Sequence, residues 1–305
     1  MAKPEWLTIK PASTEKYAEI KESVRSEGLH TVCVEAHCPN ISECWSGGTA
    51  TFMVLGELCT RGCRFCAVAK NARGEEPEHL EPEKLGRIIK KWGLEYVVIT
   101  AVCRDDLEDQ GAEHLARCVS EIRKMNPKTI IEVLSPDFRG NDECIDTLVR
   151  SRPDVVGNNI ETVKRLSPVV RDRRAGYMQT LEFLKRVKAI DPSIYTKSAI
   201  MLGLGESEDE IISSFRDLRS AKVDFLAVGQ YLRPSHAQME VKEYVNPKKF
   251  EQLKSIAEDM GFGYVAAGPF VRSSYRAGEF FIKRVIDNKR EADDHRSLDR
   301  DSPTK

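Results

Sequence analysis

The sequence has almost no net charge and no long apolar run. Its 47 Lys and Arg residues against 48 Asp and Glu residues give a formal net charge of -1, so charge gives no reason to expect a nucleic-acid partner. The longest apolar runs, such as 96–102, are far shorter than the roughly 20 residues that a membrane-spanning helix needs. We therefore expect neither nucleic acid nor membrane among the partners.

The beginning of the sequence also lacks the features of a secretory signal. Residues 1–6 contain no apolar stretch, and neither end carries a lipidation motif. The predicted location is therefore the cytoplasm, where thiols stay reduced. At the other end, residues 288–305 are charged, contain Pro303 and have no apolar periodicity, which predicts a disordered tail.

What the chain does have is a concentration of cysteine. Six of its nine cysteines form two groups of three, namely Cys33, Cys38 and Cys44, then Cys59, Cys63 and Cys66. Thiolates are soft ligands, and three at short range suit an iron–sulfur cluster or zinc better than separate structural roles. The second group has the spacing C-x3-C-x2-C, with no fourth ligand close in sequence. Such a set leaves the open coordination position that a catalytic metal requires.

Two other uses of these cysteines stay open at this point. Disulfides would require an oxidising compartment, for which the sequence gives no indication. Structural zinc also uses short Cys spacings, but neither group has an obvious fourth Cys or His at finger spacing. His37 lies inside the first group and is interpreted as an exposed loop residue. Cys118 and Cys144 lie in helical patterns and are expected to be core residues.

From Thr51 onward, apolar runs of strand length alternate with segments of helical period. This alternation is typical of βα units around a parallel sheet, and 305 residues suit a single barrel. The predicted fold class is α/β, a partial (β/α)6-type TIM barrel with N-terminal and C-terminal extensions. The expected strands are 51–55, 96–102, 129–134, 154–157, 195–202, 225–228 and a weaker 264–267.

Polar residues follow these strands at the end where the βα loops converge. Chemistry in such barrels gathers at the C-terminal ends of the strands. Any one of these residues alone is as easily a solvated loop or a helix cap, but their joint position beside the cysteine loop favours a shared site. The candidates for cofactor or substrate contacts are Arg104, Asp105, Asn159, Glu161, Gly203 and Glu206.

The cysteine loop resembles a known signature. C-x3-C-x2-C after the first strand of a βα barrel, with the aromatic Phe65 before its last cysteine, is similar to the motif of the radical S-adenosylmethionine (SAM) superfamily. The resemblance implies a barrel of the radical SAM type. It also implies that Cys59, Cys63 and Cys66 hold a 4Fe-4S cluster whose fourth iron binds SAM.

Further motifs are similar to those of the lipoyl synthase family. Residues 28–45, with C-x4-C-x5-C, resemble its auxiliary-cluster motif, and R-S-S-Y-R-A-G at 272–278 resembles its serine-bearing motif. Matching stretches run from about Trp6 to Arg284. The resemblance implies a second 4Fe-4S cluster on Cys33, Cys38, Cys44 and one serine. We align that serine as Ser274, with Ser273 as the alternative.

The resemblance implies a sulfurtransferase that inserts two sulfur atoms at C6 and C8 of a protein-bound octanoyl-lysine. One cluster would cleave SAM, and the auxiliary cluster would donate the sulfur. The implied partners are an octanoylated lipoyl carrier domain or H protein, an electron donor such as ferredoxin or flavodoxin, and iron–sulfur assembly or carrier proteins. The resemblance implies four parts of the chain. Residues 1–50 are an extension with the auxiliary-cluster cysteines, and residues 51–270 are the barrel. Residues 271–287 carry the serine motif, and residues 288–305 are the tail.

Some positions depart from that family's pattern, and other functions stay open. Cys103 stands where the family usually has Asp, and Asn158 where it has His; we interpret Cys103 as a neutral apolar replacement. The basic run of Arg171, Arg173 and Arg174 either attracts an acidic carrier domain or is merely a solvated charged face. Alternatives are another radical sulfur-inserting enzyme, of the biotin synthase or methylthiotransferase kind, and an iron–sulfur electron carrier or scaffold. The first cysteine group and the R-S-S-Y motif favour the lipoyl synthase family.

Overall fold

One eight-stranded sheet, with its strands in chain order, forms the centre of the protein. The computed structural model describes residues 3–8, 14–46, 51–274 and 286, so the predicted tail lies outside the described residues. The strands are β1 (His30–Thr31), β2 (Thr51–Val54), β3 (Tyr96–Ala101), β4 (Ile130–Leu134), β5 (Val155–Gly157), β6 (Tyr195–Leu202), β7 (Phe225–Gln230) and β8 (Tyr264–Gly268). All seven expected strands are confirmed.

Strands β2 to β8 are parallel, and β1 adds to β2 in the antiparallel direction. The sequence did not predict β1, because two residues are too short to show a period. Within the described part of the chain, β1 pairs only with β2 and β8 only with β7, so the barrel is open along one side. This confirms the predicted partial barrel.

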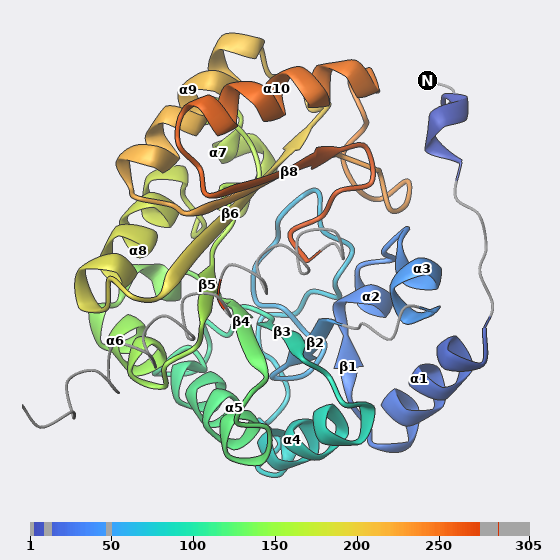
Figure 1. Ribbon diagram of the computed structural model, residues 1–305, viewed down its shortest axis with the longest axis vertical. Coiled ribbons are helices and arrows are strands. Elements are labelled where there is room, and N and C mark those ends of the chain that lie inside the picture. Colours follow the sequence, from blue (N-terminus) through green and yellow to red (C-terminus); the bar gives the residue numbers. More distant parts are fainter. Residues whose placement is uncertain (1–2, 9–13, 47–50, 275–285, 287–305) are drawn as a thin grey trace, which may run out of the picture.

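Six helices connect the parallel strands and cover the outside of the sheet, as Figure 1 shows. They are α4 (Glu81–Trp92), α5 (Ala112–Met125), α6 (Asp142–Arg150), α8 (Tyr177–Ile190), α9 (Glu208–Ser220) and α10 (Pro247–Asp259). Six βα units followed by β8 confirm the (β/α)6-type architecture. No helix among these described residues is long and apolar enough to cross a membrane.

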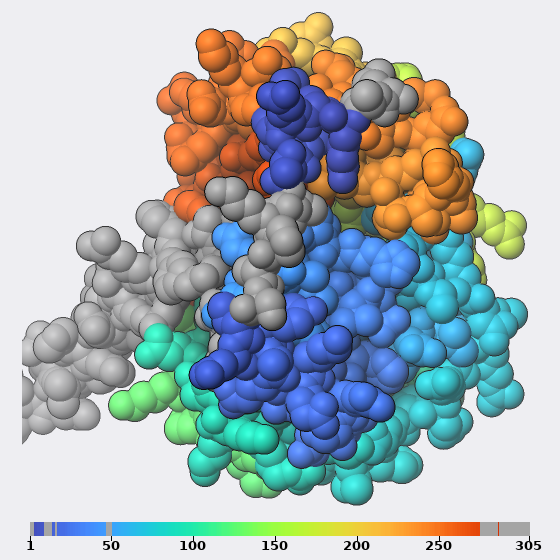
Figure 2. All heavy atoms as spheres, turned by 90° about the vertical axis from the view of Figure 1, so that its right-hand side faces the viewer, coloured from blue at the N-terminus to red at the C-terminus, as the bar shows by residue number. Residues whose placement is uncertain are grey.

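Six further helices precede the barrel or lie in its loops within the described residues. They are η1 (Glu5–Leu7), α1 (Glu15–Ser26), α2 (Val32–Glu35), α3 (Ile41–Ser46), η2 (Phe138–Gly140) and α7 (Ser167–Val170). Helices α1 to α3 lie beside β1 and β2 on the open side of the barrel (Figure 1). The blue N-terminal residues spread across this side in Figure 2. The N-terminal segment therefore covers the side that the sheet leaves open.

The helices follow from ordinary sequence rules. In α4 the apolar residues recur at helical spacing and are buried against the sheet, and the helix ends at Gly93, whose φ is 61°. In α9 the Ser207 hydroxyl accepts from the Glu210 N–H while the Glu210 carboxylate accepts from the Ser207 N–H. This reciprocal cap satisfies backbone donors that the first turn leaves free.

The inside of the barrel carries a charged layer above an apolar one. At the N-terminal ends of the strands, Tyr96, Ile130, Val155, Phe225 and Ile286 form a buried apolar cluster. Two positions further along β4 and β6, the Lys197 Nζ lies 2.9 Å from both carboxylate oxygens of Glu132. The side chains are 6% and 0% exposed. Both charges are therefore desolvated and depend on each other.

The chain after β8 turns back against the barrel. Val271 packs on Ala199 of β6 and Ala227 of β7. A Cβ on Gly229 would lie 2.1 Å from the Val271 carbonyl oxygen, so only glycine allows this approach. The Asn40 side-chain amide donates to the Phe270 carbonyl at 2.7 Å. The N-terminal segment and the chain after β8 are thus fixed to each other beside the open end of the barrel.

We expect Lys197→Met to lower the free energy of unfolding by about 3–5 kcal/mol, because Glu132 would stay buried without its cation. Urea unfolding of the variant measures this loss. The double variant Glu132→Leu/Lys197→Met removes both charges and should recover most of it. A single variant as stable as the unchanged chain would contradict the dependence of the two charges on each other.

We expect Gly229→Ala to lower stability by about 1–3 kcal/mol, because the new methyl group forces β7 and residue 271 apart. Thermal unfolding measures the loss, and faster hydrogen exchange at residues 270–274 would locate it. The control is Gly176→Ala, whose Cβ would have its nearest neighbour at 3.6 Å. Equal stability of the two variants would show that the close approach is not important.

Candidate metal centre

Two adjoining cavities lie at the end of the barrel where the strands finish. Their volumes are about 270 Å³ and about 230 Å³; we call them the first and second cavity. Phe65, Cys66, Leu134, Asn159 and Glu161 line both cavities. The two cavities therefore share a wall, at the strand ends where the sequence predicted a site.

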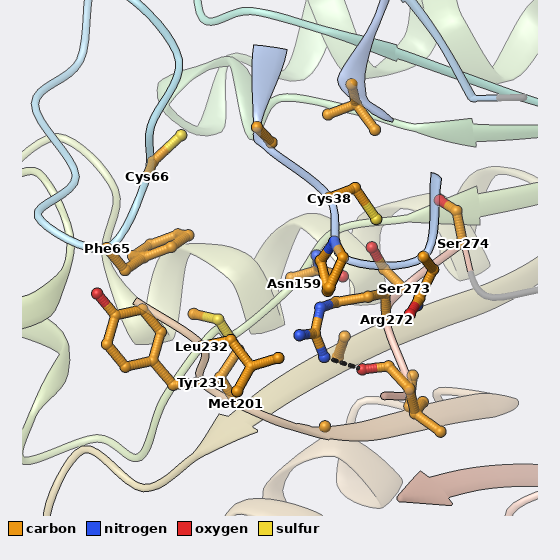
Figure 3. A pocket seen from close by; sticks show the side chains of 18 of the residues that line it. Cys38, Phe65, Cys66, Asn159, Met201, Tyr231, Leu232, Arg272, Ser273 and Ser274 are labelled. Carbon is orange, nitrogen blue, oxygen red and sulfur yellow. Dashed lines mark hydrogen bonds between the residues drawn. The ribbon is translucent and has the colours of Figure 1, made fainter. Parts of the chain in front are cut away.

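The first cavity brings together the N-terminal cysteines and the C-terminal serines. Its lining includes Cys33, Cys38 and Cys44 together with Ser273 and Ser274. Figure 3 shows Cys38 and both serines on one side of this cavity, with Cys66 on the other. Of the R-S-S-Y-R-A-G motif, only the first three residues belong to the described part of the chain.

Two short helices and the turn between them position the first cysteine group. Cys33 lies in α2, Cys44 lies in α3, and Cys38 lies in the turn between them. The Cys38 N–H donates to the Cys33 carbonyl at 3.0 Å, and the Cys44 N–H donates to the Asn40 carbonyl at 2.9 Å. His37 is exposed, as the sequence predicted. Three thiols that are separated in sequence therefore face one space.

The second cavity contains the C-x3-C-x2-C group. Cys59, Cys63 and Cys66 line it, in the loop that follows β2. The Cys59 N–H donates to the Ala69 carbonyl at 2.8 Å, and the Cys63 Sγ accepts from the Asp172 N–H at 3.3 Å. The first bond closes the two ends of the loop on each other, and the second attaches the loop to residue 172. Each cysteine group occupies one cavity, with Cys66 on the shared wall.

A buried arginine fixes this loop to the barrel. Arg61 stands between the first two cysteines, and its guanidinium pairs with Asp105 at 2.8 Å and with Asp137 at 2.7 Å. Burial alone would lower the pKa of Arg61, but its hydrogen bonds and charge contacts with these carboxylates raise it. Arg61 therefore stays charged. Sequence reasoning missed this role of Arg61, although a basic residue inside a cysteine loop was a visible indication.

The thiols of the second cavity differ in acidity. The hydrogen bond with Cys103 lowers the pKa of Cys59 to about 6. Burial raises the pKa of Cys66 to about 12 and also raises the pKa of Cys63. In the first cavity, burial raises the pKa of Cys38. Because the thiolate is the metal ligand, most of these groups gain from a cation that favours the charged form.

The donor sets fit iron–sulfur clusters. All of the described cysteines are free thiols, and the wall of each cavity includes all three cysteines of one group. In the lining of the second cavity, the buried atoms Asn158 Oδ1, Asn159 Oδ1 and Arg171 Nε have no hydrogen-bond partner in the described structure. Buried polar atoms of this kind are normally paired. A polar ligand next to the thiols would pair them.

The structure divides the predicted contact residues into two sets. Asn159 and Glu161 line both cavities. Glu161 has a positive φ of 65°, and burial raises the pKa of its carboxyl group, against the effect of the Arg171 charge. The other four residues are outside both linings: Arg104 pairs with Asp106, Asp105 with Arg61, and the Glu206 carboxylate accepts from the Gly203 N–H.

Comparisons with known proteins agree with this geometry. Residues 53–218 match the model of the Radical SAM superfamily. The chain is 51% identical over 281 residues to a lipoyl synthase from an Anaeromyxobacter species, covering 92% of this chain and 95% of that protein. A mitochondrial lipoyl synthase from Candida glabrata is 50% identical over 298 residues, covering 96% and 76%.

One relative is much longer than this chain. The apicoplast lipoyl synthase of Toxoplasma gondii is 49% identical over 295 residues, which cover 94% of this chain but 54% of that protein. The chain thus spans about half of the length of that relative. It covers three quarters or more of the Candida and Anaeromyxobacter proteins.

Solved structures share the fold at low sequence identity. Methylornithine synthase (PylB) aligns with a TM-score of 0.55 at 12% identity, over 72% of each chain. The FeFe-hydrogenase maturase HydG from Carboxydothermus hydrogenoformans has a TM-score of 0.55 at 12% identity, over 90% of this chain and 78% of that one. These likenesses show the partial barrel alone. The superfamily match and the relatives at about 50% identity show that this chain belongs to the lipoyl synthase family of sulfur-inserting radical SAM enzymes.

Proposed function

We propose that the two cavities hold two 4Fe-4S clusters and carry out the family's sulfur insertion. Cys59, Cys63 and Cys66 hold the cluster that binds SAM. The auxiliary cluster is held by Cys33, Cys38, Cys44 and Ser274. The observation that carries the proposal is that each cysteine group lines its own cavity and the two cavities share a wall. The reaction inserts two sulfur atoms at C6 and C8 of a protein-bound octanoyl-lysine.

The chain itself supplies binding and the exclusion of water. The bound clusters and SAM supply the radical and the sulfur, which aliphatic carbon requires because it offers no acidic proton for acid–base catalysis. Apolar residues of β6, β7 and the following loop line the first cavity, among them Ala199, Met201, Ala227 and Leu232. An alkyl chain along this wall would be shielded from water and lie between the two cysteine groups.

The unpaired polar atoms of the second cavity are the proposed contacts for SAM. Within the described residues, Asn158 Oδ1 and Asn159 Oδ1 are acceptors without a donor, and Arg171 Nε is a donor without an acceptor. The amino and carboxylate groups of SAM offer the matching donor and acceptor. Glu161 adds a carboxylate beside Arg171.

In our proposal, the four predicted contact residues that lie outside the cavity linings support the residues that line them. Asp105 holds Arg61 and thereby the cysteine loop. Arg104 donates to the Leu55 carbonyl at 3.4 Å and steadies the end of β2. Gly203 and Glu206 shape the loop after β6 through their mutual hydrogen bond.

The division of the chain follows the same proposal. Residues 1–50 bring the auxiliary-cluster cysteines, residues 51–270 form the radical SAM barrel, and residues 271–287 bring the serine ligand. The hydrogen bond between Asn40 and Phe270 supports this arrangement, because it attaches the N-terminal segment to the last residue before the segment with the serine ligand. The tail 288–305 stays a prediction.

The proposed substrate carrier is an octanoylated lipoyl domain or H protein. The proposed electron donor is ferredoxin or flavodoxin, and assembly or carrier proteins would deliver the clusters. The basic run offers less for docking than the sequence indicated, because Arg171 is buried and Arg174 pairs with Asp172 at 2.9 Å, while Arg173 is exposed. A cytoplasmic location stays a prediction, since the eukaryotic relatives are named as organellar and the bacterial one carries no compartment name.

Two cysteine variants separate the proposed roles of the cavities. We expect Cys63→Ala to abolish the formation of 5'-deoxyadenosine from SAM under dithionite, because the radical-forming cluster loses a ligand. Cys38→Ala should still cleave SAM but give no lipoyl product. Product analysis of an octanoyl-lysine peptide by mass spectrometry measures both. Normal lipoylation by Cys38→Ala would contradict the assigned sulfur source, and no SAM cleavage by the unchanged chain would favour an electron carrier.

The serine pair offers a matched test of the fourth ligand. We expect Ser274→Ala to alter the iron content and the Mössbauer spectrum of the auxiliary cluster, since a coordinating oxygen is removed. Ser273→Ala should leave both unchanged. Both serines line the first cavity, so general damage to the cavity would affect the two variants alike. The opposite pattern would assign the ligand to Ser273.

A further inference from the structure

A fourth thiol lies in the second cavity beside the C-x3-C-x2-C group. Cys103 follows the end of β3 and lines this cavity together with Cys59, Cys63 and Cys66. Its side chain forms a hydrogen bond with that of Cys59. The interpretation of Cys103 as a neutral apolar replacement is therefore incomplete, because its sulfur faces a reactive partner.

The backbone keeps these two cysteines together. The Cys103 carbonyl accepts from the Thr60 N–H at 2.9 Å and from the Thr60 hydroxyl at 2.9 Å. The Asp105 N–H donates to the same hydroxyl at 3.0 Å. Thr60, the residue next to Cys59, is thus attached to residues 103–105. A disulfide requires two Cβ atoms held close together, and these bonds keep the two residues in adjacent positions.

The other cysteines are less suited to react with Cys103. Cys63 and Cys66 also line the second cavity, but the side-chain partner of Cys103 is Cys59. Cys118 lies in α5 and Cys144 in α6, and both are buried. The shared cavity and the attachment through Thr60 therefore favour the pairing of Cys103 with Cys59.

We propose that Cys59 and Cys103 form a reversible disulfide when Cys59 carries no iron, which makes this pair a redox-sensitive modification site in the second cavity. The inference rests on the proposed role of Cys59 as a cluster ligand. Glutathione disulfide, or another small disulfide, is the oxidant. One protein thiolate attacks it and releases one glutathione; the second protein thiolate then displaces the other glutathione. One S–S bond forms in the protein, one breaks in the oxidant, and the two thiol protons go to the two glutathione molecules.

The disulfide would have two consequences for the chain. It would occupy a ligand thiol, so that the SAM-binding cluster assembles only after a dithiol has reduced the bond. It would also keep Cys59 from further oxidation to the sulfinic and sulfonic acids, the latter of which is irreversible. The pair thus preserves the ligand thiol until a cluster is inserted.

The experiment uses the full chain after anaerobic removal of iron by a chelator. The protein is exposed to glutathione disulfide, remaining thiols are blocked with N-ethylmaleimide, and an unreduced digest is examined by mass spectrometry. We expect a peptide pair linked through Cys59 and Cys103, with the loss of two free thiols, reversed by dithiothreitol. Cys103→Ala should give only a glutathione adduct on Cys59. The control Cys118→Ala should form the same link as the unchanged chain.

Several results would overturn the proposal. They are a link from Cys59 to Cys63 or Cys66, or no internal link in the unchanged chain. Iron and sulfide content after anaerobic purification gives a second readout, in which Cys103→Ala should equal the unchanged chain. If this variant instead loses one cluster, Cys103 is itself a ligand and the proposal fails. The assignment of Cys59 to the SAM cluster is tested separately by the Cys63→Ala variant.

Discussion

The buried charge of Arg61 is the contact on which the second cavity depends. Its guanidinium lies between two carboxylates at the ends of the strands, Asp105 after β3 and Asp137 after β4. All three side chains are at most 5% exposed, so none of these charges is stable there without the others. Since Arg61 lies inside the cysteine loop, this pairing converts a flexible connection into a fixed set of thiols. Ion pairs of Arg61 thereby position the loop on the barrel.

The first cavity is built differently, from both ends of the chain. Short helices aim Cys33, Cys38 and Cys44, while the chain after β8 brings the serines across the barrel mouth. Two contacts hold the serines near the cysteines. They are the Asn40 hydrogen bond to the Phe270 carbonyl and the close approach of the Val271 carbonyl to Gly229. A serine oxygen is a poorer partner for iron than a thiolate. A serine ligand suits a centre that gives up its sulfur in the proposed reaction.

The part of the barrel interior below the cavities stabilises the fold. Its lower end is closed by an apolar cluster, and the ion pair between Glu132 and Lys197 lies above it. Such an ion pair adds little stability compared with apolar packing, but it joins β4 and β6 across β5, which lies between them in the sheet. The apolar and polar walls of the two cavities begin only above this layer.

The sequence by itself determined the cysteine groups, the seven parallel strands and the family, because spacing, alternation and motifs are local properties of the chain. It also placed Asn159 and Glu161 correctly at the strand ends. It did not show that Arg104 and Asp105 lie outside the cavities, that Arg61 carries the cysteine loop, or that Cys103 meets Cys59. Only the tertiary structure decided these points, because they depend on which side of a loop faces inward and on contacts between residues far apart in sequence.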